Sequence, residues 1–259
     1  MGSHIFRRQG YFASGFDYST TGHEAYMVEV FSHCLDSNPG AFIDVGVNLG
    51  QTLTKILGID ANREYIGFEP QIACSFNVEQ FLRLNNLNNA QVLPIALSDS
   101  NEMLKIYSQG QFDEMASLRT NSQSDPDLTR VSYVQSRIGD DVFEELKIGK
   151  ICAIKIDVEG AELRVLRGMK ETLRKKAQAI IFEVLPNFSG ITNRKMNPTE
   201  DCFANQIMAD SIYSLLTNYG YDIFQIENQS RERKTSRFEL NDMTGFVGSN
   251  YIALASIDS

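Results

Sequence analysis

The sequence contains little histidine and no closely spaced cysteines. Of its 259 residues 3 are histidine, and neither His23 nor His33 has a partner at the spacing of zinc ligands. A zinc site is therefore not expected. The 4 cysteines are far apart and form no C-x-x-C pair. This usage predicts reduced, mostly buried thiols in a cytoplasmic protein, at Cys34, Cys74, Cys152 and Cys202.

Positive charge is also scarce, and long apolar runs are missing. With 24 Lys and Arg against 33 Asp and Glu, the formal net charge is −9, which argues against general binding to nucleic acids. No run of about eighteen apolar residues occurs. No signal-peptide core follows the start, so neither a membrane span nor secretion is expected. The residues from Met1 to His4 have the composition of a segment left over from an expression vector. The sequence leaves open whether the protein forms a homodimer.

Two common phosphate-binding motifs are absent. No G-x-x-x-x-G-K-[ST] string occurs, which excludes a P-loop. The pattern G-x-G-x-x-G, whose middle glycine admits a pyrophosphate, is replaced by Gly46 and Gly50 with Asn48 between them. A side chain at that centre crowds a diphosphate but tolerates a ligand without one. S-adenosylmethionine fits this description, because it combines adenosine with a zwitterionic amino-acid tail.

The same glycines belong to a strand–turn–helix, the most informative feature present. An apolar run predicts a strand over 41–45, and a helix over 51–57 follows the bend. Such a unit brings backbone N–H groups and a helix N-terminus to one small ligand. A second apolar run ends on Glu69, 19 residues after Gly50, where an acid is placed to bind both ribose hydroxyls. Asp44, at the first strand tip, could accept a hydrogen bond from the ligand's ammonium group or order water there.

Strand and helix signals alternate along the rest of the chain. They predict an α/β fold with a doubly wound, mostly parallel sheet and right-handed crossovers. Residues 100–137 differ, because two alternating segments flank a polar stretch, and they predict an inserted hairpin or flexible lid. We expect an irregular arm at 1–20, a single domain over 21–259, and a polar, mobile segment at 228–249. The expected strands are 41–45, 65–69, 91–94, 151–158, 179–185, 221–226 and 251–256. The expected helices are 21–35, 51–57, 73–84, 140–146, 162–176 (as one or two helices) and 203–218.

A second informative string, IKIDVEGAE at 154–162, places charges inside a predicted central strand. Alternation puts Lys155, Asp157 and Glu159 on one face, where charges are costly unless they line a cleft or pair together. Ligand clefts form at the tips of parallel strands, and Glu183 lies beside Asp157 if their strands are neighbours. These residues are catalytic candidates, because two acids could hold a substrate hydroxyl and take its proton. An alcohol is a poor nucleophile that needs a base or a metal. For Lys155 an ion pair with one of these acids is the other interpretation.

Together these residues resemble the FkbM family of S-adenosylmethionine-dependent methyltransferases. The resemblance covers 24–185 and implies the class I, Rossmann-like methyltransferase fold, with a seven-stranded, mostly parallel sheet and an antiparallel edge hairpin. It also implies, as the usual activity, O-methylation of a sugar, glycan or natural product. The strings that carry it are DVGVNLG (44–50), FEP (68–70), ALSD (96–99), KIDVEGAE (155–162) and VLRG (165–168).

By position, the resemblance implies where each part of the cofactor lies. The bend at 44–50 would lie under the methionine part, Glu69 on the ribose, residues 98–99 near the adenine, and Asp157 beside the methyl group. S-adenosylhomocysteine would be the product, and a divalent metal is neither required nor excluded. The cofactor-binding residues would be Asp44, Gly46, Asn48, Gly50, Glu69, Pro70, Ser98, Asp99 and Asp157.

Two other functions fit part of this pattern. A non-catalytic S-adenosylmethionine-binding module would keep the bend but lose the strand-tip acids, which are all present here. A nicotinamide-dependent oxidoreductase could use a similar sheet, but the glycine spacing and the lack of a Tyr-x-x-x-Lys pair count against it. Residues 1–20 and 186–259 match little of the family pattern. We expect them to select the acceptor, a small molecule or a glycan.

Overall fold

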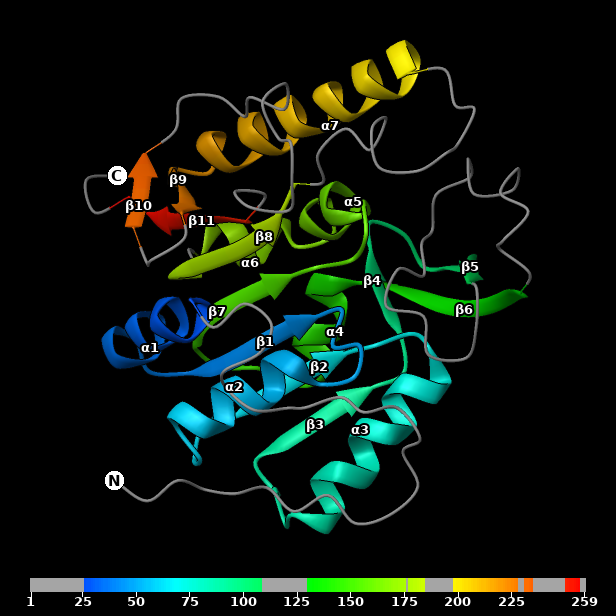
Figure 1. Ribbon diagram of the computed structural model, residues 1–259, viewed down its shortest axis with the longest axis vertical. Coiled ribbons are helices and arrows are strands. Elements are labelled where there is room, and N and C mark those ends of the chain that lie inside the picture. Colours follow the sequence, from blue (N-terminus) through cyan, green and yellow to red (C-terminus); the bar gives the residue numbers. More distant parts are fainter. Residues whose placement is uncertain are drawn as a thin grey trace.

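The computed structural model shows a twisted sheet with helices on both faces (Figure 1). It describes residues 26–108, 130–175, 177–184, 198–227, 231–234 and 250–256. The predicted arm at 1–20 therefore lies outside the described residues. No helix in the described part of the chain is long and apolar enough to cross a membrane.

The main sheet has eight strands in the order β10-β9-β11-β8-β7-β1-β2-β3. Strands β3, β2, β1, β7 and β8 are parallel to one another, and β11 is antiparallel to both β8 and β9. This confirms the predicted doubly wound sheet with an antiparallel edge. The strands are β1 (Ala41–Val45), β2 (Tyr65–Phe68), β3 (Ala90–Leu93), β7 (Ile151–Ile156), β8 (Ala179–Glu183), β9 (Tyr221–Glu227), β10 (Arg231–Lys234) and β11 (Asn250–Ala255).

The strand β10 is an addition to the seven expected strands. It pairs antiparallel with β9 at the sheet edge, within the segment 228–249 that we expected to be polar and mobile. That expectation was wrong for 231–234. The strand has the sequence RERK, and its backbone pairs with β9 alone in the described sheet.

Each face of the sheet carries its own apolar core. Alternate residues of β1 point to opposite faces, so Ile43 belongs to one cluster and Phe42 to the other. All five residues of β1 are buried, as expected for a central strand covered on both sides. Helices α1, α2 and α3 pack on the Phe42 face, and α4 to α7 pack on the Ile43 face. The helices are α1 (Met27–Ser37), α2 (Gln51–Ile59), α3 (Ile72–Leu84), α4 (Gly139–Glu145), α5 (Glu162–Arg167), α6 (Lys170–Arg174) and α7 (Pro198–Asn218).

A second, smaller sheet has the strand order β4-β6-β5 and extends to one side of the molecule (Figure 1). Its strands are β4 (Ala96–Ser98), β5 (Glu102–Ser108) and β6 (Arg130–Ile138). The antiparallel pair β5–β6 confirms the predicted hairpin, and Ile106 and Val134 pack with Ala96 in a small cluster of their own. The residues between the two strands, 109–129, lie outside the described part.

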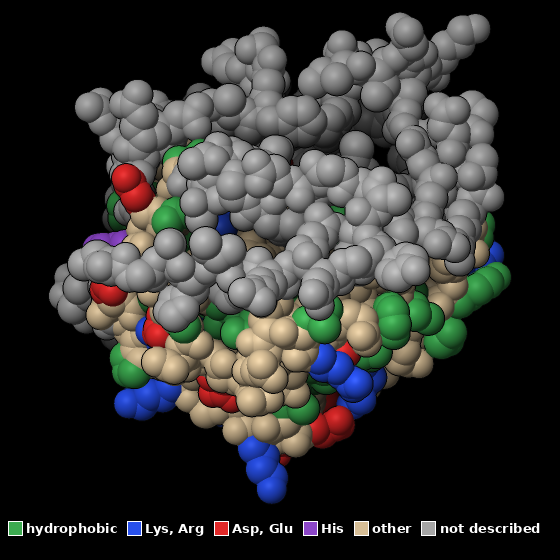
Figure 2. Space-filling view, turned by 60° about the horizontal axis from the view of Figure 1, so that its bottom comes forward, with side chains coloured by type: hydrophobic (Ala, Val, Ile, Leu, Met, Phe, Trp, Pro, Cys, Tyr) green, Lys and Arg blue, Asp and Glu red, His purple; other side chains and the backbone are tan. Residues whose placement is uncertain are grey.

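The face shown in Figure 2 has acidic and basic side chains interspersed, without a continuous basic stripe among the described residues visible there. Three of the predicted thiols, Cys34, Cys74 and Cys152, are buried and form no disulfide within the described part of the chain. The side chain of Cys202 lies outside the described residues.

Candidate functional site

The bend between β1 and α2 is built from left-handed backbone. Gly46, Asn48 and Gly50 have φ angles of 93°, 52° and 90°. Asparagine tolerates this region better than most side chains, which explains how it can stand at the centre of the bend. A Cβ on Gly46 would lie 1.9 Å from the backbone oxygen of Asp157, so glycine is also required there by the close approach of β7.

Glu69 closes this bend from the neighbouring strand. Its Oε2 accepts a hydrogen bond of 2.8 Å from the backbone N–H of Asn48, and its Oε1 accepts one of 2.8 Å from the N–H of Gln71, just beyond Pro70. The side chain is only 4 % exposed. Burial raises the pKa of Glu69 to about 7, although the two backbone N–H groups act in the opposite direction. The carboxylate predicted to bind ribose therefore lies at the glycine bend.

Asp44 is fully buried beneath the bend, on the face of the sheet that α1 to α3 cover. Its Oδ2 accepts a hydrogen bond from the hydroxyl of Tyr65. Burial raises the pKa of Asp44 to about 6, while the charge of Lys155 and the Tyr65 hydrogen bond lower it. Two buried acceptors in this region, Asp44 Oδ1 and Asn48 Oδ1, have no hydrogen-bond partner among the described residues. Two such unpartnered oxygens favour the binding of a ligand that carries hydrogen-bond donors.

The predicted acids meet at the ends of β7 and β8. The two strands are parallel neighbours, and the pairing of Ile156 with Phe182 brings Asp157 and Glu183 to the same level. Lys155 Nζ lies 2.7 Å from Asp157 Oδ2, so the ion pair considered for this lysine is present. The lysine side chain is 8 % exposed and that of Asp157 36 % exposed, so the acid is the accessible partner.

The placement of Glu159 on the same strand face was wrong. Strand β7 ends at Ile156 instead of Val158, and Glu159 has a left-handed φ of 52° in the turn that follows. Alternation along the strand therefore stops before it. The buried carboxylate of Glu162 holds this turn, because its Oε1 accepts hydrogen bonds from the N–H groups of Val158 and Gly160 at 3.3 and 3.0 Å.

Ser98 and Asp99, predicted near the adenine, lie at the end of β4. Ser98 is buried, and Asp99 Oδ1 accepts a hydrogen bond of 2.9 Å from Arg164 Nε on α5. The other end of the guanidinium donates to Ser100 Oγ at 2.8 Å and to Glu102 Oε1 at 2.6 Å. Burial raises the pKa of Asp99, but the hydrogen bond and charge of Arg164 outweigh it and leave the pKa below its ordinary value.

The structure therefore brings two groups of the sequence-predicted residues together at the carboxyl ends of the parallel strands, whereas Ser98 and Asp99 lie at the end of β4 in the smaller sheet. The bend residues meet Glu69, while Asp157 lies beside Glu183 on the adjacent strands. Tyr65 and Arg164 were missed. The tyrosine stands in an apolar run and looked like core, and the arginine is 65 positions away from the aspartate that it contacts.

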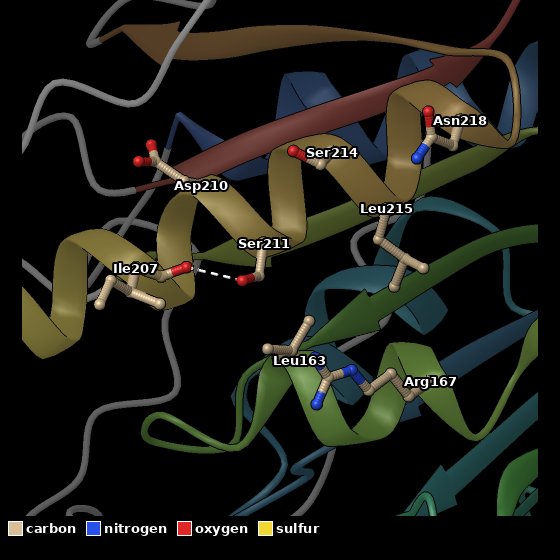
Figure 3. Close-up of a pocket in the computed structure, with 8 residues that line it drawn as sticks. All are labelled: Leu163, Arg167, Ile207, Asp210, Ser211, Ser214, Leu215 and Asn218. Atoms are coloured by element: carbon tan, nitrogen blue, oxygen red, sulfur yellow. Dashed lines mark hydrogen bonds between the residues drawn. The ribbon is translucent and has the colours of Figure 1, made fainter.

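A separate groove of about 460 Å³ runs between α5 and α7 (Figure 3). Leu163 and Arg167 of α5 face the α7 side chains across it, and Ser211 Oγ donates to the backbone oxygen of Ile207 at 2.7 Å. None of the sequence-predicted site residues lines this groove.

The strand order, the glycine bend and the acid at the end of β2 define a class I methyltransferase fold. Residues 44–223 match the methyltransferase FkbM domain, so the chain belongs to the FkbM family of methyltransferases. No curated protein matches the chain by sequence.

Solved structures share the fold at low sequence identity. A proposed caffeoyl-CoA O-methyltransferase from Staphylococcus aureus is 12 % identical, with a TM-score of 0.50 over 89 % of this chain and 83 % of that one. The S-adenosylhomocysteine-bound methyltransferase PaMTH1 from Podospora anserina is 9 % identical, with a TM-score of 0.50. The match covers 90 % of this chain and 77 % of that one. Methyltransferase FkbM from Methylobacillus flagellatus KT is 13 % identical, with a TM-score of 0.49 over 83 % of this chain. The match spans only 43 % of that longer protein.

Proposed function

We propose that this protein transfers a methyl group from S-adenosylmethionine to a hydroxyl oxygen of a sugar, glycan or natural product. The observation that carries the proposal is the position of Glu69. Its carboxylate is fixed by the Asn48 N–H at the glycine bend, where a ribose diol can reach it. The family membership supports the methyl transfer, and the carboxylates at the neighbouring strand tips support an oxygen acceptor.

The bend suits the cofactor chemically. The Asn48 side chain stands where a diphosphate would need open backbone, which favours a ligand without phosphates. The unpartnered acceptors Asp44 Oδ1 and Asn48 Oδ1 suit the ammonium of an amino-acid tail, which has three N–H donors. S-adenosylmethionine supplies a methyl group on a positively charged sulfur, and the anionic surroundings of Asp44 and Asp157 favour that charge.

In this proposal Asp157 and Glu183 receive the acceptor. Lys155 occupies Asp157 Oδ2, which leaves Oδ1 to accept a hydrogen bond from the acceptor hydroxyl and to take its proton. Glu183 at the same level on β8 would hold the other side of that hydroxyl or a neighbouring one. Much of the rate would then come from orientation, because Glu183 ends β8 and Asp157 follows directly after the buried strand β7. We place the whole chain beyond residue 20 in one methyltransferase domain, with the β5–β6 hairpin as its insertion.

Calorimetry with S-adenosylhomocysteine and with NADH tests the cofactor. We expect saturable binding of S-adenosylhomocysteine and none of NADH, and the reverse result would favour an oxidoreductase. Release of S-adenosylhomocysteine is then measured with acceptors chosen from the products of neighbouring genes. Cofactor binding with no methylated product from any hydroxyl-bearing acceptor would favour a non-catalytic binding module.

A further inference from the structure

Tyr65 occupies an unusual place for a polar side chain. It is the first residue of β2 and is fully buried. Its ring stacks on Phe42 of β1, with centroids 6.1 Å apart and planes 9° from parallel. A Cβ on Gly67 would lie 3.1 Å from the Tyr65 ring and 2.5 Å from Val47, so the lack of a side chain there makes room for the ring. The phenol can therefore extend along the sheet toward the glycine bend.

Among the described residues the Tyr65 hydroxyl donates a hydrogen bond to the carboxylate of Asp44. A phenylalanine would fill the same apolar space without burying a polar group, which costs free energy unless a hydrogen bond compensates it. The hydrogen bond from Tyr65 engages Asp44 Oδ2. Asp44 Oδ1 is then a buried acceptor with no donor among the described residues. The hydroxyl therefore fixes which oxygen of Asp44 stays available.

We propose that Tyr65 is a positioning residue for the cofactor. Its hydroxyl holds the Asp44 carboxylate ionised and in one orientation, so that Oδ1 accepts a hydrogen bond from the ammonium group of the cofactor's amino-acid tail. Gly67 contributes by leaving space for the tyrosine ring. This inference rests on the proposed function, since it assumes that S-adenosylmethionine and S-adenosylhomocysteine occupy the bend.

The groups around Asp44 set the direction of the expected effect. Lys155 of β7, in register with Asp44, and Lys55 of α2 favour the ionised carboxylate, whereas Asp157 opposes it. Glu69 adds a further acidic group on the side of β2. Burial already raises the pKa of Asp44 to about 6, and the Tyr65 hydrogen bond is one of the contacts that hold it down. Loss of the hydroxyl should raise that pKa toward neutrality, and a protonated Asp44 is a poorer acceptor.

Calorimetric titration of the full chain with S-adenosylhomocysteine, from about pH 5 to about pH 8, tests this role. Tyr65→Phe keeps the ring and removes the hydroxyl. We expect about tenfold weaker binding at neutral pH, in line with loss of support for a charge-assisted hydrogen bond. We also expect the pH at which binding is half-lost to move upward. Wild-type affinity with an unchanged pH profile would overturn the proposal.

Tyr221→Phe is the matched control. Tyr221 is also buried, but its hydroxyl donates to the backbone oxygens of Leu173 and Ala177, on the other face of the sheet. This variant should lose some stability and keep the affinity and its pH profile. In an Asp44→Asn background, Tyr65→Phe should cause little further loss of affinity, because the two residues act through one contact. A full additional loss there would show that Tyr65 acts independently of Asp44.

A measurement on the wild-type chain covers the case in which Tyr65→Phe does not fold. Carbon-13 NMR of the Asp44 carboxyl group should show its pKa falling when S-adenosylhomocysteine is added, because the bound ammonium favours the carboxylate. An unchanged pKa would overturn the proposal. If the wild-type chain binds neither S-adenosylhomocysteine nor S-adenosylmethionine, the proposed function itself fails; normal wild-type binding with an unaffected Tyr65→Phe refutes only the role of Tyr65.

Discussion

The ammonium of Lys155 lies 2.7 Å from the Asp157 carboxylate, two residues further along the chain. Lys155 belongs to β7 and Asp157 follows directly after that strand, and the lysine is the buried member of the pair. The ion pair with this buried cation directs one oxygen of the half-exposed acid inward. The outer oxygen is then available to an acceptor, which makes Asp157 the first residue to test.

Asp157→Asn should leave the fold intact and lower turnover by about a hundredfold or more, because an amide cannot take a proton from the acceptor. Initial rates of S-adenosylhomocysteine release, with an acceptor that the wild type methylates, measure this effect. Asp141→Asn removes an exposed acid from the first turn of α4 and should keep the wild-type rate. Equal rates for Asp157→Asn and the wild type would remove Asp157 as a catalytic residue.

Glu69→Ala should weaken S-adenosylhomocysteine binding by about 1–3 kcal/mol, through loss of a charge-assisted contact to the ribose. Calorimetry at neutral pH gives the difference directly. Glu79→Ala serves as control, since Glu79 pairs with Arg83 on the exposed side of α3. Unchanged affinity after Glu69→Ala would refute the ribose assignment even if the bend itself binds the cofactor.

Two glycine-to-alanine changes should have opposite effects on stability. Gly46→Ala forces a Cβ to within 1.9 Å of a backbone oxygen at a φ of 93°, so we expect loss of a few kcal/mol or failure to fold. Gly58 lies in α2, and a Cβ added there would meet nothing within 4 Å, so Gly58→Ala should stabilise the protein by about 0.5–1 kcal/mol. Urea unfolding of the two variants measures both values. A stable, cofactor-binding Gly46→Ala protein would contradict the close approach of β7.

The buried acids predict a pH dependence of stability. The pKa of Asp44 is raised from 3.8 to about 6 and that of Glu69 from 4.5 to about 7. As the pH rises through this range, the unfolded chain releases these protons first, so the contribution of both groups to stability is present in acid and lost by neutral pH. The unfolding free energy of the wild type should therefore fall between about pH 4 and about pH 7, relative to an Asp44→Asn, Glu69→Gln double variant, by a few kcal/mol. Parallel profiles for the two proteins would show that folding does not raise the pKa of either acid.

Arg164→Gln should loosen the β5–β6 hairpin, because it removes charged contacts to both Asp99 and Glu102. Hydrogen exchange of the backbone in 102–106 and 131–137 is expected to become faster while β1 and β7 keep their protection. Arg167→Gln, one turn further along α5 and lining the groove of Figure 3, is the control and should leave the hairpin unchanged. Equal hydrogen-exchange rates in both variants would mean that the packing of the small apolar cluster is sufficient to hold the hairpin without Arg164.

Local signals in the sequence predicted the part of the site that depends on short stretches of chain. Glycine spacing and an apolar run specify the bend, and the distance to the next strand tip places Glu69 beside it. The sequence did not reveal where the strand carrying Asp157 ends, because the alternation of residue types continues through Glu159. The left-handed backbone of Glu159 and the hydrogen bonds that Glu162 accepts from Val158 and Gly160 decide that boundary, and neither leaves a signal in the alternation of residue types.

The remaining contacts could not be read from the sequence, since they join positions far apart. Tyr65 and Asp44 are 21 residues apart, and a tyrosine in an apolar strand is ordinarily a core residue. The pairing of Arg164 with Asp99 needs the packing of α5 beside β4, which no local pattern specifies. Strand β10 was missed for a different reason, because its charged residues lack the apolar signal by which strands are recognised.

Helix α5 contacts two segments of the candidate site through residues of a single turn. Glu162 accepts hydrogen bonds from the loop that follows Asp157. Arg164, two positions later, donates hydrogen bonds to residues 99–102 at the base of the hairpin. A helix this short has no room to bend between those two attachments. It therefore links the loop after Asp157 directly to the base of the β5–β6 hairpin, so a displacement of either segment would strain its contacts with α5.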